Sequence, residues 1–115
     1  MNCHLIGNEV NLEVPLVTVN HDAPIRVAIR AGDIMIAIGK PVGLSARNTL
    51  KGVLVSVRRE AVTMIVTVNA GVNFEVYLTP NACRELDLKP KDEVWLVIKT
   101  YSCHLVDRDD LSLAK

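Results

Sequence analysis

The sequence predicts an all-β fold, and alternating hydrophobicity is the main reason. Hydrophobic and polar residues alternate in about seven short segments, as they do in strands that face a core on one side only. Turn-forming residues separate these segments, and a single short stretch has the features of a helix. Many short strands joined by turns are typical of a β-barrel or a β-sandwich.

The alternating segments follow one another along most of the chain. In the first, Val10, Leu12 and Val14 lie on one face, and Asn11 and Glu13 lie on the other. The segments expected to form strands are 10–16, 25–30, 34–38, 49–57, 62–68, 72–78 and 94–99. Turns are expected at residues 20–22, 31–33, 69–71 and 89–92, where Asn, Asp, Gly and Pro cluster.

The helix is expected between the sixth and seventh strands. Thr79 can cap its N-terminus, and Pro80 suits the first helical position. Residues 81–86 then make about two turns. Pro90 disfavours helix at Lys89, so the segment 86–90 should close the element.

Composition limits the class of protein. A chain of 115 residues with 50% hydrophobic residues is one folded domain with a real core. Basic and acidic residues balance at 13 each and aromatics make up 3%, which disfavours nucleic acid as a partner. No apolar run is long enough to span a bilayer, and the polar first residues are unlike a signal peptide. Three cysteines without close spacing favour a reducing compartment, so the expected location is cytoplasmic.

A run of hydrogen-bond donors precedes the fourth expected strand. Ser45, Arg47 and Asn48, with Ala46 between them, offer a hydroxyl, a guanidinium and a carboxamide. No carboxylate occurs between Asp33 and Glu60. Donors without an acid nearby predict a site for an oxyanion. An ordinary turn is the alternative interpretation of such a tetrapeptide.

The chain also contains a degenerate internal repeat. Residues 10–16 match residues 72–78, and residues 29–31 match residues 98–100. The second pair is farther apart by roughly the length of the expected helix, which the first half lacks. Chance similarity between alternating segments is the alternative. The repeat pairs Arg30 with Lys99, and it raises the hypothesis of a second, weaker anion site at Arg30.

Taken together, these motifs resemble a known family. Ser45-Ala46-Arg47-Asn48, then Leu78-Thr79, then Ile98-Lys99-Thr100 are similar in order and spacing to the molybdate-binding Mop or TOBE domain. The stretch from 25 to 106 resembles the C-terminal regulatory region of the ATP-binding subunit of molybdate ABC transporters. No phosphate-binding Gly-Lys-Ser/Thr loop accompanies it. We therefore expect an N-terminal β half at 1–40, a Mop/TOBE domain at 41–107 and a polar tail at 108–115.

The resemblance implies a more specific fold and site. The fold would be an OB-like five-stranded barrel with one short helix, preceded by an N-terminal β extension. Such domains associate into dimers or rings and hold anions at subunit interfaces. The residues implied near the anion are Ser45, Arg47, Thr79, Lys99 and Thr100, with Ala46 and Asn48 in backbone or supporting contacts. Ala82 departs from the family pattern, which often has a serine there, so one hydroxyl contact is missing.

The chemistry of these residues is consistent with a tetrahedral dianion, which offers only acceptors and needs only donors. Arg47 and Lys99 supply charge, and the start of the helix at Thr79 supplies free N–H groups. Each residue also has a plainer role. Thr79 can be only a cap, Lys99 a solvated lysine, and Arg47 the partner of a surface acid. The joint spacing favours the binding interpretation.

Two Cys-His pairs raise the question of zinc. Cys3-His4 and Cys103-His104 would complete a tetrahedral site if the termini met. Neighbouring strand residues point to opposite faces, so buried cysteines with surface histidines are the better interpretation, and we expect no metal. Cys83 is expected on the helix, with its side chain in the core.

These inferences combine into one functional hypothesis. We expect a non-enzymatic, cytoplasmic, homo-oligomeric domain that binds molybdate or tungstate for storage or for regulation of molybdate transport. Transporter components are candidate partners, whereas nucleic acid and membrane insertion are not expected. The alternative is a structural or assembly domain, derived from a transporter subunit, that has no functional anion site. No cluster of catalytic acid, base and nucleophile is evident.

Overall fold

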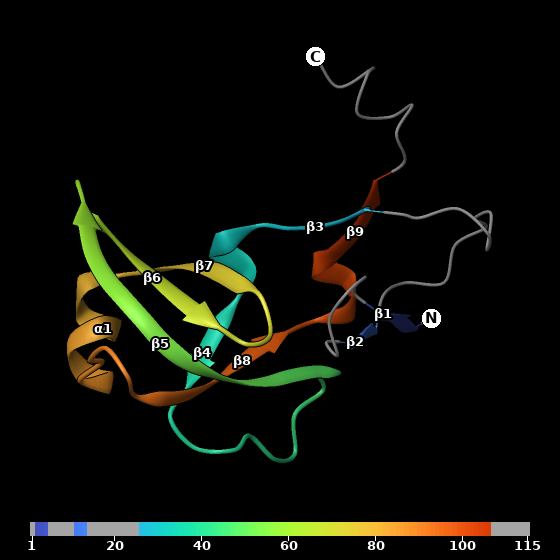
Figure 1. Ribbon diagram of the computed structural model, residues 1–115, viewed down its shortest axis with the longest axis horizontal. Coiled ribbons are helices and arrows are strands. Elements are labelled where there is room, and N and C mark those ends of the chain that lie inside the picture. Colours follow the sequence, from blue (N-terminus) through green and yellow to red (C-terminus); the bar gives the residue numbers. More distant parts are fainter. Residues whose placement is uncertain (1, 5–10, 14–25, 107–115) are drawn as a thin grey trace.

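A computed structural model describes residues 2–4, 11–13 and 26–106 of the chain (Figure 1). Statements about structure below concern these residues, and predictions for 14–25 and for the tail lie outside them. In chain order the elements are β1 (Asn2–His4), β2 (Asn11–Glu13), β3 (Arg26–Ile29), the 3-10 helix η1 (Ala31–Asp33), β4 (Met35–Ala37), β5 (Asn48–Glu60), β6 (Thr63–Asn69), β7 (Asn73–Leu78), α1 (Pro80–Leu86), β8 (Glu93–Ile98), the 3-10 helix η2 (Thr100–Ser102) and β9 (Cys103–Val106).

A five-stranded antiparallel sheet organises the fold, in the order β4-β8-β5-β6-β7. β5 is the central strand, and it pairs with one neighbouring strand along each half of its length. Its first half, from Asn48 to Val53, pairs with β8, and its second half, up to Glu60, pairs with β6. A register shift between Leu54 and Ser56 marks a bulge where the strand changes direction. This bend lets one long strand curl the sheet around a core.

The sheet is strongly curved but not closed by strand pairing. η1 lies against β7, between the two edge strands β4 and β7. The inner face carries most of the side chains that alternation predicted, although Val62 and Ile38 are exposed. The fully buried side chains of the sheet are Leu54, Val66, Val68, Val76, Val94, Leu96 and Ile98. The predicted fold class is thereby confirmed: the protein is an all-β domain with an OB-like five-stranded sheet, one short helix and an N-terminal β extension.

The helix forms where the sequence predicts it. The Thr79 hydroxyl accepts a hydrogen bond from the backbone N–H of Ala82 at 3.1 Å, and Pro80 occupies the first turn. Cys83 is the buried residue of α1, as expected. The helix ends at Asp87, which adopts the left-handed conformation with φ 50° and ψ 49°, before Pro90 can act.

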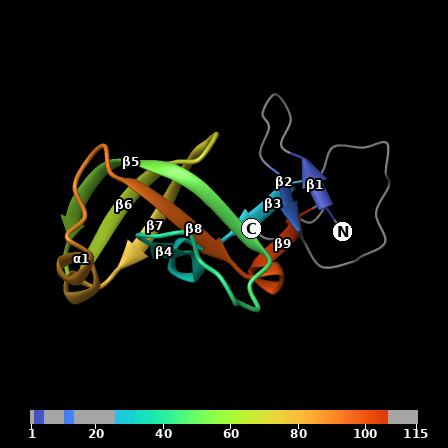
Figure 2. The same cartoon turned by 90° about the horizontal axis from the view of Figure 1, so that it is seen from below.

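Two small sheets lie at the end of the molecule opposite α1 (Figure 2). β1 pairs with β2, and β3 pairs with β9, which has no counterpart among the predicted strands. Leu12 of β2 and Cys103 of β9 are buried in the same core cluster as the main sheet. The N-terminal extension therefore packs on the domain through its apolar face.

The segments 29–31 and 98–100, which match in sequence, also follow the same backbone path. Arg30 has φ −71° and ψ 136°, and Lys99 has φ −70° and ψ 145°; each precedes a 3-10 helix. The carbonyl of each accepts a bond from the third residue on, at 2.9 Å in one case and 3.0 Å in the other. Each 3-10 helix is followed by a strand or an extended residue that enters one. The predicted turn at 31–33 is thus a 3-10 helix.

No helix in the described part of the chain is long and apolar enough to cross a bilayer.

Candidate functional site

The predicted donor residues meet where β5 begins and β8 ends. Asn48, the first residue of β5, is the register partner of Ile98, the last residue of β8. In an antiparallel pair, the residue before Asn48 and the residue after Ile98 therefore lie side by side. This relation brings the backbone of Arg47 next to that of Lys99, although they are 52 residues apart in the sequence (99 − 47).

Asn48 is the buried centre of this region, with 4% of its surface exposed. Its Oδ1 accepts a hydrogen bond from the backbone N–H of Glu13 at 2.6 Å, and its Nδ2 donates to the backbone carbonyl of Glu13 at 2.8 Å. Nδ2 also lies 3.8 Å from the sulfur of Cys103. The carboxamide thus joins β2, β5 and β9. It is already occupied by these partners, so its role is to hold the region together.

Lys99 and Thr100 lie on the other side of the same junction. The Lys99 carbonyl accepts from the Ser102 N–H at 3.0 Å and from the Cys103 thiol at 3.7 Å, which fixes the backbone of η2. The Lys99 side chain is exposed. The hydroxyl oxygen of Thr100 is buried and has no hydrogen-bond partner among the described residues. A buried hydroxyl without a partner carries a free-energy cost that a bound ligand would relieve.

Ser45 and Ala46 precede this junction. Ser45 lies exposed in a bend, and Ala46 is half-buried. Gly43, in the approach to the bend, has a φ of 69°, a left-handed conformation that glycine adopts without strain. The loop therefore turns into β5 with the Ser45 side chain in solvent.

The prediction that no acid lies near these donors is wrong. The Glu13 carboxylate is 3.0 Å from Nε of Arg47, and the pair is also hydrogen-bonded. The carboxylate comes from β2, 34 residues earlier in the chain, so the sequence around Arg47 does not reveal it. Arg47 thus has the plainer role, as the partner of an acid.

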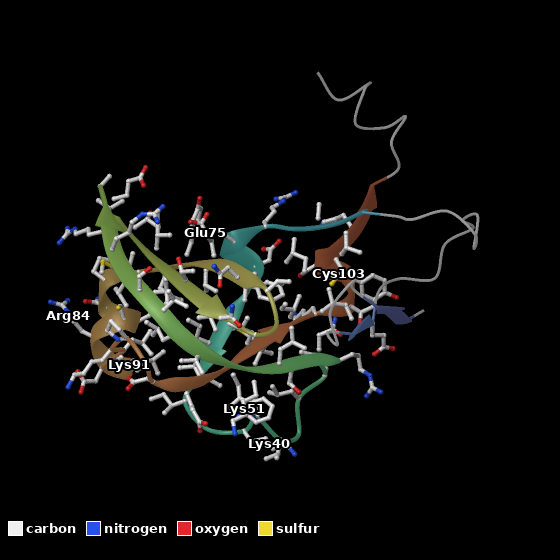
Figure 3. All side chains as sticks on the ribbon, viewed as in Figure 1. Lys40, Lys51, Glu75, Arg84, Lys91 and Cys103 are labelled. Carbon is white, nitrogen blue, oxygen red and sulfur yellow. The ribbon has the colours of Figure 1, made fainter. Side chains whose placement is uncertain are left out.

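Thr79 lies far from the other predicted residues. Leu78 pairs with Met64, and Met64 pairs with Arg59. Thr79 therefore lies near the C-terminal end of β5, whereas Asn48 is at the N-terminal end of that strand. Eleven residue steps of strand correspond to about 35 Å. Figure 3 shows the same arrangement, with Arg84 of α1 at the left edge of the sheet and Cys103 well to its right, beyond the sheet. A single chain therefore does not bring the Thr79 hydroxyl to Arg47, Lys99 and Thr100.

Two contributors were missed in the sequence. The sequence places Glu13 on the polar face of a strand, and it indicates a buried Cys103 but not the contact of its sulfur with Asn48. The alternation that places Leu12 inward could have indicated that Glu13 faces outward, but not that it meets Arg47. Cys103 is 1% exposed and His104 is exposed, so the interpretation as a buried cysteine with a surface histidine is confirmed for this pair. The side chains of Cys3 and His4 lie outside the described structure.

Within the described residues, no three His, Cys, Asp or Glu side chains are grouped so that they could hold a metal ion. The donors at the junction are hydroxyl, ammonium and guanidinium groups. Such groups suit an anion.

Comparison with known proteins agrees with this fold and donor set. The family model of the TOBE domain matches residues 44–105, which is more than half of the chain. The chain therefore belongs to the TOBE domain family. The match begins at the donor loop and ends in β9, so it includes both sides of the junction.

Similar curated proteins are molybdenum import ATP-binding proteins named ModC. That of Mesorhizobium japonicum is 37% identical over 94 residues, which are 79% of this chain and 25% of the relative. That of Rhizobium etli is 33% identical over 91 residues, 77% of this chain and 26% of the relative. The chain thus spans about a quarter of the length of the curated relatives it matches.

A similar solved structure is that of the cytoplasmic molybdate-binding protein ModG, in a form with molybdate bound. It superposes with a TM-score of 0.64 at 28% identity, over 70% of this chain and 60% of that one. The resemblance to the Mop/TOBE family and to the transporter ATP-binding subunit is thus confirmed.

Proposed function

We propose that this chain is a non-enzymatic binding domain for a tetrahedral oxyanion, with molybdate as the ligand and tungstate as its closest chemical substitute. The observation that carries the proposal is the buried Thr100 hydroxyl, which has no partner among the described residues and lies next to Lys99. A tetrahedral dianion would accept from this hydroxyl and from the cationic groups of Arg47 and Lys99. The bound molybdate of the ModG structure supports the choice of ligand.

Four residues of one chain form the proposed binding set. Arg47 and Lys99 would supply charge, and Ser45 and Thr100 would supply hydroxyls. The backbone of Ala46 and the carboxamide of Asn48 would support them, Asn48 by holding the junction between β2, β5 and β9. Charge-assisted hydrogen bonds of this kind contribute about 1.5–3 kcal/mol each.

Thr79 enters this proposal through a second copy of the chain. Its distance from Arg47 along β5 means that one chain cannot use both residues at one anion. A homo-oligomer that places α1 of one copy against the β5–β8 junction of another would unite them. Bound anion would then stabilise the assembly by mass action.

The biological role proposed is storage of the anion or regulation of its transport, in the cytoplasm. The ATP-binding relatives, of which this chain spans about a quarter, support transporter components as partners. The division into 1–40, 41–107 and 108–115 stays part of the proposal. In the structure β4 joins the main sheet and β9 pairs with β3, so the first two segments interleave.

A structural or assembly domain without a functional anion site is the second candidate. The ion pair between Arg47 and Glu13 favours it, because the guanidinium already has an anionic partner. Ala82 favours it as well, since no side-chain hydroxyl is present there to assist Thr79.

Isothermal titration with molybdate separates the two candidates. We expect heat with molybdate and none with sulfate, and loss of the molybdate signal in Arg47→Ala and in Lys99→Ala. The matched control is Lys51→Ala, which removes an exposed lysine of β5 that pairs with Glu93 at 3.6 Å; it should bind as the unmodified protein does. Absence of heat with molybdate at micromolar protein would contradict the binding function and leave the assembly role.

A further inference from the structure

We propose that the Glu13 carboxylate is a built-in competitor for the oxyanion at Arg47, so that filling of the site is coupled to the contact between β2 and β5. The inference rests on the proposed function and adds a regulatory element to it. The competing group is anionic like the ligand, accepts hydrogen bonds as the ligand does, and lies 3.0 Å from the guanidinium nitrogen.

The backbone of Glu13 is held in place, and this positions its carboxylate beside Arg47. Asn48 bonds both the N–H and the carbonyl of Glu13, at 2.6 and 2.8 Å, and Leu12 is buried in the core with 2% of its surface exposed. With Leu12 directed inward and the Glu13 backbone clamped, the Glu13 side chain must project outward. The ion pair is therefore built by the fold, in contrast to a pair formed by two long side chains on flexible segments.

A ligand can nevertheless replace the Glu13 carboxylate at Arg47 with little cost in free energy. The Arg47 side chain is 68% exposed and that of Glu13 is 36% exposed. Exposed ion pairs contribute little to stability, because water competes for both groups. Nε of Arg47 is the donor engaged by Glu13, and the guanidinium has further N–H groups for a ligand. A dianion that also receives bonds from Lys99 and Thr100 can therefore displace a single carboxylate.

Displacement has two consequences that follow from charge. The anion must overcome the Arg47–Glu13 attraction and the repulsion from the nearby carboxylate, so Glu13 raises the anion concentration needed to fill the site. By reciprocity, a bound anion weakens the hold of Arg47 on Glu13 and thus on β2. The clamp through Asn48 keeps the backbone of β2 in place, which confines the change to the side chain and to the strength of the contact.

Titration of the full chain with molybdate tests the coupling. Glu13→Gln preserves side-chain size and leaves both backbone bonds to Asn48, and melting temperatures verify that the variant folds. We expect its Kd for molybdate to be about three- to tenfold lower than that of the unmodified protein. The matched control is Glu93→Gln, which removes the same charge from an exposed ion pair with Lys51. Glu93 pairs with Val53, five residues beyond Asn48 along β5, and should change the Kd less than twofold.

The outcomes separate this inference from the proposed function. If the unmodified protein binds and Glu13→Gln binds equally or more weakly, the competitor is disproved and the binding function stands. If the unmodified protein gives no heat, the binding function fails, and the inference fails with it.

Discussion

The carboxamide of Asn48 holds Glu13 by both of its backbone polar groups, across a separation of 35 residues. The Asn48 side chain bonds the N–H and the carbonyl of Glu13 as the backbone of a neighbouring strand would. It fastens the N-terminal extension at the point where β5 begins and Lys99 follows β8. The same contact therefore determines the stability of the extension and the position of an acid beside the proposed anion site.

Replacing Asn48 tests the stabilising part of this contact. Asn48→Ala leaves the half-buried N–H and carbonyl of Glu13 without their partner, and we expect a loss of about 2 kcal/mol in the free energy of unfolding. Asn73→Ala is the control, since Asn73 is exposed on β7 and makes one side-chain bond with Asn69; it should change stability by less than about 0.5 kcal/mol. Urea denaturation measures both. Equal stability of the two variants would show that the contact contributes little.

A second prediction concerns the close packing of β5 against the end of β6. A Cβ at Gly52 would lie 2.7 Å from the Asn69 carbonyl oxygen and 2.8 Å from a methyl of Val68. Gly52→Ala should therefore destabilise the protein by about 1–3 kcal/mol, because backbone must move to relieve the contact. At Gly39 nothing lies within 4 Å of the added atom, so Gly39→Ala should be neutral or slightly stabilising. Thermal unfolding of both variants tests this prediction. A Gly52→Ala variant as stable as the unmodified protein would show that the backbone at this point can move apart without a cost in stability.

A third prediction separates the two possible roles of Thr100. Thr100→Val replaces a buried hydroxyl that has no partner among the described residues, so the free energy of unfolding without ligand should stay the same or rise by up to about 1 kcal/mol. If the hydroxyl bonds the anion, molybdate binding should weaken by about tenfold. Thr67→Val, on β6, serves as the binding control. A variant that loses stability and binds molybdate normally would contradict both parts.

The strands and the helix can be predicted from the sequence because they depend on residues that are close together in the chain. Alternation places Val66, Val68 and Val76 on the inner face, and each is fully buried. Thr79 and Pro80 mark the helix start because the cap bond joins residues three apart. The path shared by Arg30 and Lys99 likewise depends on a few neighbouring residues.

The site could be predicted only in part, because its arrangement depends on contacts between segments that are distant in the sequence. Arg47 and Lys99 are adjacent because β5 and β8 pair in one register, which the sequence does not state. The presence of Glu13 beside Arg47 was missed because it depends on the docking of β2 by Asn48 and Leu12. The separation of Thr79 from these residues follows from the length of β5, which continues beyond the predicted 49–57 to Glu60.

By itself, then, the sequence determined the strand segments, the helix with its cap, the class of fold and the kinds of donor available. These depend on side-chain period and on bonds between near neighbours, which are present in any linear reading of the chain. Tertiary structure alone decided which donors share one place, which acid lies beside them and which predicted residue is far away. Those relations depend on strand register and on a buried carboxamide, and both arise only when distant segments pack.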